Sequence, residues 1–340
     1  MKGSDKSQIE RSGSAEYIVG VDLGGTNIRA AACNRDGRIL GEARCDSLAM
    51  VGLDATVGQI IKAVRDCIEK AGIAVADVVG VGMGVPGHHK SKEGIVLWSP
   101  NFKNWDGVQL LEPIKKDLAV PVVMGNDANV AALGEFNFGA GREVDTMVML
   151  TLGTGIGGGI ILNGRLWKGA NEGGAEIGHH IVLADGPMCS CGRHGCLESL
   201  ARRDAIIDRA ARKMLKGRPS ILLERVSNVP WNVTPAMIAE AAQEGDEIAL
   251  ETLSETGYYV GIGVANSINI INPEMVVIGG GIARAGEPLW GAIHRTVKTS
   301  ALHASQEVCR VVPAELDDDA GVMGGVTLVI HEVLHEYSKS

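Results

Sequence analysis

The chain has 340 residues, of which 45% are hydrophobic and 21% charged, and its formal net charge is −9. This acidity argues against binding to nucleic acid, which normally leaves a basic surface, and no apolar run approaches the roughly 20 residues that a membrane-spanning helix needs. Residues 1–16 are polar and lack the apolar stretch of a signal peptide. We therefore expect a cytoplasmic globular protein with a disordered leader at residues 1–16.

Short apolar segments separated by glycine turns make up the first third of the chain. Glycine accounts for 46 residues, nearly twice its usual share of roughly 7%. Apolar residues on one face and a following Gly72 predict a helix over Ala55–Ala71. The other elements expected here are strands at Tyr17–Asp22, Ile28–Asn34, Arg38–Ala43, Val78–Val85 and Val120–Met124, and a helix at Leu110–Leu118.

The second part of the chain repeats this scheme. A strand at Asp145–Leu152 leads into a glycine-rich turn and then a hairpin with Asn163-Gly164 at its tip. Thr234 as N-cap predicts a helix over Pro235–Gln243, and residues 213–231 are expected to form a surface connection. The remaining elements are strands at Ile160–Leu162, Arg165–Trp167 and Met275–Ile278, and helices at Leu197–Leu215, Asp246–Ile271 and about Gly321 to Tyr337.

Such a duplicated unit predicts an α/β protein whose two domains flank a cleft. Ligands of α/β sheets bind beyond the carboxyl ends of the strands, and the glycine turns lie at such ends. Their backbone N–H groups can face an anion with no Cβ to keep it away. Either of the first two turns alone could be an ordinary hairpin, but the pair can hold a polyphosphate. The candidate nucleotide-binding residues are Gly24, Gly25, Thr26, Asn27, Gly153, Thr154, Gly155, Gly280 and Gly281.

Acidic residues also follow two of the buried strands. Asp22 offers an oxygen ligand suited to Mg²⁺, directly or through water. Asp127 can accept the proton of an attacking hydroxyl that Asn126 orients, because phosphoryl transfer needs little base strength. Taken alone, this Asn-Asp pair is more typical of a helix N-cap. Further polar partners for a polyhydroxylated ligand are Asn101, Glu176, His179 and Glu198, each of which alone is more often a solvated surface residue.

Three of the seven cysteines are clustered, at Cys189, Cys191 and Cys196. An odd number of cysteines in a chain without a signal peptide favours a metal site over disulfides. Three thiolates and one histidine form a closed, structural zinc site, for which the candidate fourth ligands are His179, His180 and His194. If His179 binds zinc through one ring nitrogen, the other nitrogen can face a substrate. The alternative is three free thiols in a loop.

In this order, the segments resemble the ROK family of repressors, open reading frames and kinases, most closely its bacterial ATP-dependent glucokinases. The resemblance runs from about Tyr17 to the last helix, and the cysteine motif is its most specific part. The segments that carry it are Asp22–Thr26, Asn126–Asn129, Leu152–Gly159, Glu176–His179 and Cys189–Glu198.

The resemblance implies an actin-like ATPase fold of the hexokinase type that closes on a hexose and Mg-ATP. It implies Asp127 as the base for the sugar 6-hydroxyl and a homodimer or homotetramer. It divides the chain into residues 17–127, joined by the helix at 321–337, and residues 128–320 with a zinc loop at 179–196. The sugar contacts then fall on Asn101, Asn126, Asp127, Glu176, His179 and Glu198, and the zinc ligands on His179, Cys189, Cys191 and Cys196.

Two alternatives remain open. A ROK kinase could act on N-acetylglucosamine, N-acetylmannosamine, allose or fructose in place of glucose. A ROK repressor would sense a sugar and bind DNA through a helix-turn-helix domain ahead of the first strand. A first strand near Tyr17 leaves no room for that domain, and the acidic net charge also disfavours it.

Overall fold

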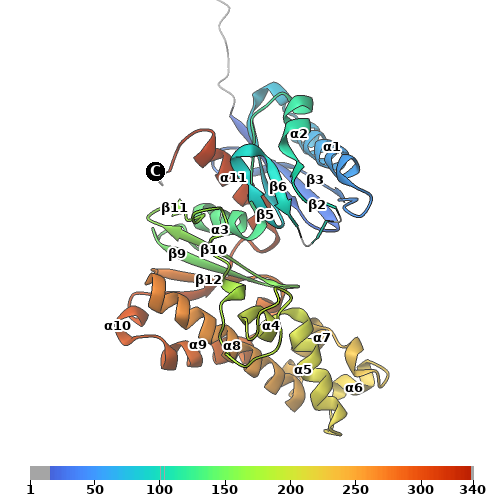
Figure 1. Ribbon diagram of the computed structural model, residues 1–340, viewed down its shortest axis with the longest axis vertical. Coiled ribbons are helices and arrows are strands. Elements are labelled where there is room, and N and C mark those ends of the chain that lie inside the picture. The colour runs from blue at the N-terminus through green and yellow to red at the C-terminus, as the bar shows by residue number, and fades with distance from the viewer. Residues whose placement is uncertain (1–15, 100, 103, 338–340) are drawn as a thin grey trace, which may run out of the picture.

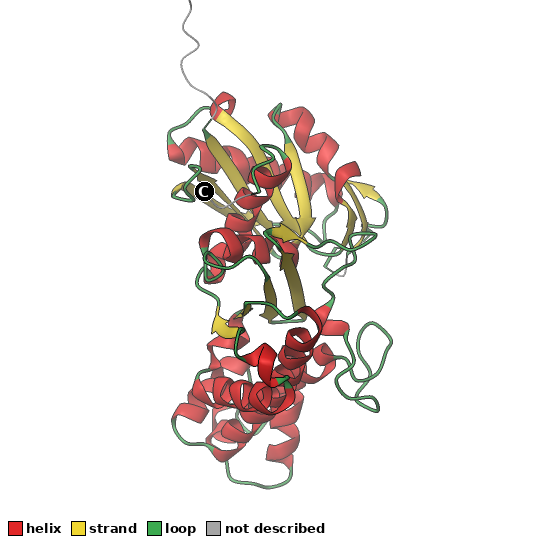
Figure 2. Cartoon of the chain, turned by 90° about the vertical axis from the view of Figure 1, so that its left-hand side faces the viewer, coloured by secondary structure: helices red, strands yellow, loops and turns green. Residues whose placement is uncertain are grey.

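The structure is a computed structural model that describes residues 16–99, 101–102 and 104–337. The predicted leader therefore lies, apart from Glu16, outside the described residues. The molecule is elongated, with two five-stranded β-sheets separated by a layer of helices, a small three-stranded sheet, and further helices at either end (Figures 1 and 2). This layered α/β architecture agrees with the predicted fold class.

The first sheet has five strands. β1, β2 and β3 are antiparallel, whereas β1, β4 and β8 are parallel and bring their carboxyl ends to one edge. Helices α1 (Leu53–Ala71) and α2 (Leu111–Leu118) cover one face, and α1 ends at Gly72 with a left-handed φ of 69°, as predicted. The strand order is β3 (Ile39–Asp46), β2 (Asn27–Cys33), β1 (Tyr17–Leu23), β4 (Val78–Val85) and β8 (Val122–Asn126).

The second sheet repeats this arrangement of antiparallel and parallel strands, which confirms the predicted duplication. In the first sheet Asp22 pairs with Arg29 next to the turn, and in the second Thr151 pairs with Gly157. Helices α8 (Glu247–Ile271) and α9 (Glu287–Ser300) cover its outer face. The order is β11 (Arg165–Leu166), β10 (Ile156–Leu162), β9 (Met147–Leu152), β12 (Met275–Gly279) and β13 (Arg310–Pro313).

Helices α3 (Asp127–Phe138) and α11 (Ala320–Glu332) pack against each other between the two sheets (Figure 1). Helix α11 approaches the first sheet so closely that a Cβ at Gly82 would lie 1.9 Å from the carbonyl oxygen of Gly325. On the other side, a Cβ at Gly159 would lie 2.3 Å from the Cβ of Ala132 in α3. Glycine therefore lets the strands and helices of this layer touch through their backbones.

The remaining elements differ in part from the prediction. The helix expected over Leu197–Leu215 is two helices, because Arg202 between them has an extended backbone. The connection at 213–231 contains a short helix, and α11 ends at Glu332 rather than near Tyr337. Thr234 caps its helix as predicted, accepting from Met237 N at 3.2 Å. These elements are β5 (His88–Lys90), β6 (Ile95–Trp98), β7 (Val108–Gln109), α4 (Leu197–Ala201), α5 (Arg203–Leu215), α6 (Ile221–Arg225), α7 (Pro235–Gln243) and α10 (His303–Gln306).

Within the described part of the chain, every helix is too short or too polar to cross a lipid bilayer.

Candidate active site and zinc centre

The carboxyl ends of β1 and β8 place Asp22 and Asp127 at the same edge of the first sheet. Asn126 is the N-cap of α3, where its Oδ1 accepts from Ala128 N at 3.0 Å and from Asn129 N at 3.1 Å. Its Nδ2 donates to Gly87 O at 3.3 Å. Asn126 therefore caps the helix, and Oδ1 of the neighbouring Asp127 accepts from Ala128 N at 2.9 Å.

Both carboxyl groups are harder to ionise than an ordinary aspartate. Burial, reinforced by repulsion from Asp127, raises the pKa of Asp22 to about 6, although Arg29 opposes the shift. Burial also raises the pKa of Asp127, and the negative charge of Glu176 adds to that shift. A half-buried carboxylate that repels a second one is a suitable place for a hard divalent cation with oxygen ligands, so Asp22 fits the predicted Mg²⁺.

The two predicted phosphate turns close their hairpins with single backbone hydrogen bonds. Gly24 N donates to Asn27 O at 2.8 Å, and Gly153 N donates to Gly155 O at 2.9 Å. No atom lies within 4 Å of the place that a Cβ on Gly153 would take, so this turn is open to a ligand. Asn101 lies against the first turn, since its Cβ is 3.3 Å from the position of a Cβ on Gly25.

The third glycine turn lies beside the second. Gly280 has a φ of 88°, and a Cβ there would lie 2.4 Å from the carbonyl oxygen of Leu152. Both observations explain glycine at this position on structural grounds alone. Gly281 starts a 3₁₀ helix and has no atom within 4 Å of its Cβ position. Its exposed backbone is compatible with a nucleotide next to Gly153–Gly155.

The cysteine cluster gathers the residues that the sequence predicts. Ligand atoms of His179, Cys189, Cys191 and Cys196 all lie within 4.8 Å of one another. The sulfurs of Cys191 and Cys196 are 3.7 Å apart, and Nδ1 of His179 is 3.6 Å from the sulfur of Cys189. Tetrahedral zinc with Zn–S bonds of about 2.3 Å separates two sulfurs by about 3.8 Å, and a sulfur and a nitrogen by about 3.6 Å. The donor set therefore fits zinc.

The other two candidate histidines make different contacts. Nδ1 of His180 contacts the carbonyl oxygen of Ile177, and Nδ1 of His194 lies 3.1 Å from Gly186 O. Burial lowers the pKa of His180. Of the three candidates, His179 is the one placed to be the fourth ligand.

The predicted sugar contacts lie around these features. Glu176 is exposed and close enough to Asp127 to raise its pKa. Glu198 is buried, and its carboxylate lies 3.7 Å from the sulfur of Cys189, which also faces His179. The structure thus groups Glu176 with Asp127, groups Glu198 with the cysteine cluster, and places Asn101 at the first phosphate turn.

Near Asp22 lies an ion-pair network that was not predicted from the sequence. Arg29 forms ion pairs with Glu42 at 2.9 Å and with Asp319 at 2.5 Å. The neighbouring Asp318 adds to the rise in the pKa of Asp22. The run of acidic residues at 317–319, just before a glycine-rich helix, was a signal for this cluster, but only the fold brings it beside β1.

Two sheets of like order, a helix pair between them and paired glycine turns define an actin-like ATPase fold. The ROK family glucokinase from Streptomyces griseus in complex with glucose and AMPPNP shares it, with a TM-score of 0.78 and 32% identity over 92% of this chain and 98% of that one. The sequence profile of the ROK family matches residues 18–332. The chain belongs to the ROK family.

Relatives with known names fall into two groups. A glucokinase from Thermotoga maritima is 38% identical over 92% of this chain and 96% of its own length. A xylose repressor from Caldicellulosiruptor bescii is 31% identical over 93% of this chain and 79% of its own length. Both groups share the family fold, so the site residues decide between catalysis and sensing.

Proposed function

We propose that this protein is a glucokinase, which transfers the terminal phosphoryl group of Mg-ATP to the 6-hydroxyl of glucose. The observation that carries the proposal is that two neighbouring residues at the start of α3 have different roles. Asn126 caps the helix, and the neighbouring Asp127 offers a half-buried carboxylate of raised pKa to a substrate. A base held in this way can accept the hydroxyl proton as the oxygen attacks phosphorus.

In this mechanism the protein mainly positions its substrates. Phosphoryl transfer has a loose transition state, so alignment and charge neutralisation provide most of the rate. Asp127 holds the 6-hydroxyl and takes its proton, while the backbone N–H groups of Gly24–Asn27 and Gly153–Gly155 hold phosphate oxygens. Asp22 would hold Mg²⁺, which neutralises phosphate charge when bound.

The sugar ring is held, in this proposal, by side chains from both sides of the site. Asn101, Asn126, Glu176, His179 and Glu198 offer donors and acceptors for its hydroxyls. Zinc on Nδ1 of His179 would fix the ring orientation so that Nε2 faces the sugar. The metal has a structural role, because four protein ligands leave no open position.

We further propose that the two halves move relative to each other as substrates bind. One body is residues 17–127 with the last helix, and the other is residues 128–320 with the zinc loop at 179–196. Gly280 and Gly281 would lie against the adenosine of ATP. The working form in this proposal is a homodimer or homotetramer.

A coupled assay of ADP release across a panel of sugars tests the activity. We expect glucose to give the highest kcat/KM, above N-acetylglucosamine, N-acetylmannosamine, allose and fructose. A higher kcat/KM for one of those sugars would reassign the substrate within the family.

Sugar binding without ADP release, together with a gel shift on operator-like DNA at low salt, would support the repressor alternative that the Caldicellulosiruptor bescii relative raises. Inorganic polyphosphate in place of ATP tests the donor in the same assay.

A further inference from the structure

A single carboxylate joins the zinc cluster to the second phosphate turn. Glu198 lies in α4 and is 9% exposed. Its Oε2 accepts from the backbone N–H of Ile156 at 2.9 Å. Its Oε1 accepts from the Ser190 hydroxyl at 3.1 Å and lies 3.7 Å from the sulfur of Cys189, a zinc-ligand candidate. The two oxygens of one side chain therefore face two different parts of the site.

The turn at Gly153–Gly155 is held at both ends, by Glu198 of α4 at one and by Arg203, the first residue of α5, at the other. Ile156, directly after the turn, is held by Glu198, and Gly153 O accepts from Arg203 N at 3.0 Å just after α4. Gly155 lies so close that a Cβ on it would be 2.6 Å from Oε2 of Glu198. The conformation of the turn therefore depends on where α4 lies.

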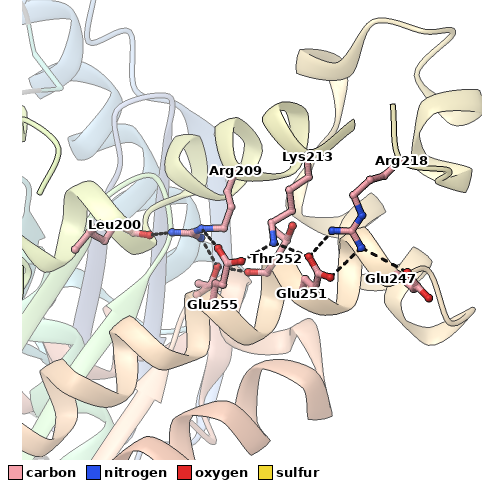
Figure 3. A network of polar contacts seen from close by, with 9 residues as sticks. Leu200, Arg209, Lys213, Arg218, Glu247, Glu251, Thr252 and Glu255 are labelled. Carbon is pink, nitrogen blue, oxygen red and sulfur yellow. Dashed lines mark hydrogen bonds and ion pairs between the residues drawn. The ribbon is translucent and has the colours of Figure 1, made fainter. Parts of the chain in front are cut away.

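Helix α4 is in turn held in place by contacts with α5 and, through it, with α8. Arg209 in α5 donates to Leu200 O of α4 at 2.6 Å and to the Thr256 hydroxyl of α8 at 2.8 Å. Figure 3 shows how this contact continues into ion pairs between α5 and α8, with Lys213 bridging Glu255 and Glu251. Because α4 is anchored to α8, the backbone of Glu198 is held in place, and a change in the cysteine loop would reach the turn through the carboxylate of Glu198, which binds the Ser190 hydroxyl with one oxygen and Ile156 N with the other.

We propose that Glu198 is a positioning residue for the nucleotide: it couples the zinc cluster to the phosphate turn, so that an intact metal site sets nucleotide affinity even when no sugar is bound. This inference rests on the proposed function and extends it, since the zinc site there serves only the sugar. A carboxylate that accepts from a backbone N–H makes a stronger bond than a neutral group does. Its loss leaves the N–H of Ile156 without its charged partner and loosens the turn.

The first test measures nucleotide binding to Glu198→Gln by titration calorimetry with AMPPNP in the absence of sugar. The amide keeps the size of the side chain but loses the charge and one acceptor. We expect the Kd for AMPPNP to rise about tenfold. An unchanged Kd for AMPPNP combined with a weakened Kd for glucose would overturn the proposal, because Glu198 would then serve the sugar alone.

Glu176→Gln is the matched control. Glu176 is the other glutamate expected to contact the sugar, and it is exposed and lies outside α4. This variant is expected to weaken glucose binding and leave the Kd for AMPPNP unchanged. An equal rise in the Kd for AMPPNP in both variants would show a general effect of lost charge and contradict a specific coupling.

The second test removes the metal and does not depend on the folding of a Glu198 variant. Zinc is withdrawn from the wild-type protein with a chelator and followed by metal analysis, and AMPPNP binding is measured before, after and upon addition of zinc. We expect the Kd for AMPPNP to rise severalfold on removal and to recover on addition. A zinc-free protein with unaltered AMPPNP affinity overturns the coupling, whereas a zinc-loaded wild type that binds no AMPPNP contradicts the proposed function itself.

Discussion

Asp127 is the residue on which the proposed chemistry depends most directly. Replacing Asp127 by Asn keeps its size and removes the group that takes the proton. We expect kcat to fall by about a thousandfold or more, within the range for loss of a general base combined with lost orientation. Glucose affinity should change little, because several other side chains hold the ring. Turnover close to that of the wild type would contradict the base assignment.

The raised pKa of Asp127 predicts a displaced acid limb in the pH profile. A base works only when ionised, so kcat/KM for glucose should fall as the pH drops through its pKa, which lies above the ordinary value of about 3.9. Removing the negative charge in Glu176→Gln makes ionised Asp127 less costly and should shift the limb to lower pH. Glu143→Gln, an exposed change after α3, is the control that should not shift it.

At the scale of single residues, the sequence predicts which side chains carry the chemistry better than it predicts which residues contact one another. The cysteine spacing predicted three of the four residues that the structure gathers into one cluster, Cys189, Cys191 and Cys196. The spacing alone left His179, His180 and His194 open as the fourth ligand; the family resemblance pointed to His179, and the fold places that residue beside the cysteines. The link from Glu198 to Ile156 N was not predictable, because it joins residues 42 positions apart through a short helix.

At the scale of elements, the close contact of strands with α11 gives a stability prediction. Gly82→Ala places a Cβ 1.9 Å from the Gly325 carbonyl oxygen in a layer that cannot yield easily. We expect the free energy of unfolding to fall by about 3 kcal/mol, as measured by urea denaturation. Gly58→Ala is the matched control, since nothing lies within 4 Å of its Cβ position in α1. It should be neutral or stabilising by up to about 1 kcal/mol.

Helix α1, with one buried face, was predicted, whereas α3, which is buried on several sides, was not; α9 was also missed although only one of its faces is buried. Helix α1 shows its apolar stripe in the sequence, and its end at Gly72 follows from the glycine alone. Helix α3 packs against the second sheet on one side and α11 on the other, so even the consecutive residues Leu133, Gly134 and Glu135 are all buried. A helix buried on several sides has no polar stripe to give it a period. The break between α4 and α5 is a single residue with an extended backbone, Arg202, and no sequence pattern predicts it.

At the scale of the whole molecule, a buried glutamate connects the two helices that lie between the sheets, α3 and α11. Glu135 of α3 accepts from Glu315 N at 3.1 Å and from Leu316 N at 2.7 Å, where the chain returns towards α11. Its side chain is fully buried. These hydrogen bonds connect the last part of α3 to the segment just before α11.

Glu135→Gln should therefore destabilise the protein. It loses charge-assisted bonds to backbone N–H groups, and we expect about 2 kcal/mol less free energy of unfolding, measured by chemical denaturation. Glu315→Gln is the control, because it removes only an exposed ion pair with Arg142 and should cost less than about 0.5 kcal/mol. Equal losses in the two variants would contradict the role of Glu135.

The two five-stranded sheets have the same arrangement of strands, but their glycine turns differ in charge. The position that Asp22 occupies in the first pair of strands is taken by Thr151 in the second, opposite Gly157. The backbone cradle is thus duplicated but the carboxylate is not, so the pair of turns has a charged end and a neutral end. We expect a polyphosphate bound between them to favour one direction, because the end with Asp22 differs in charge from the end with Thr151.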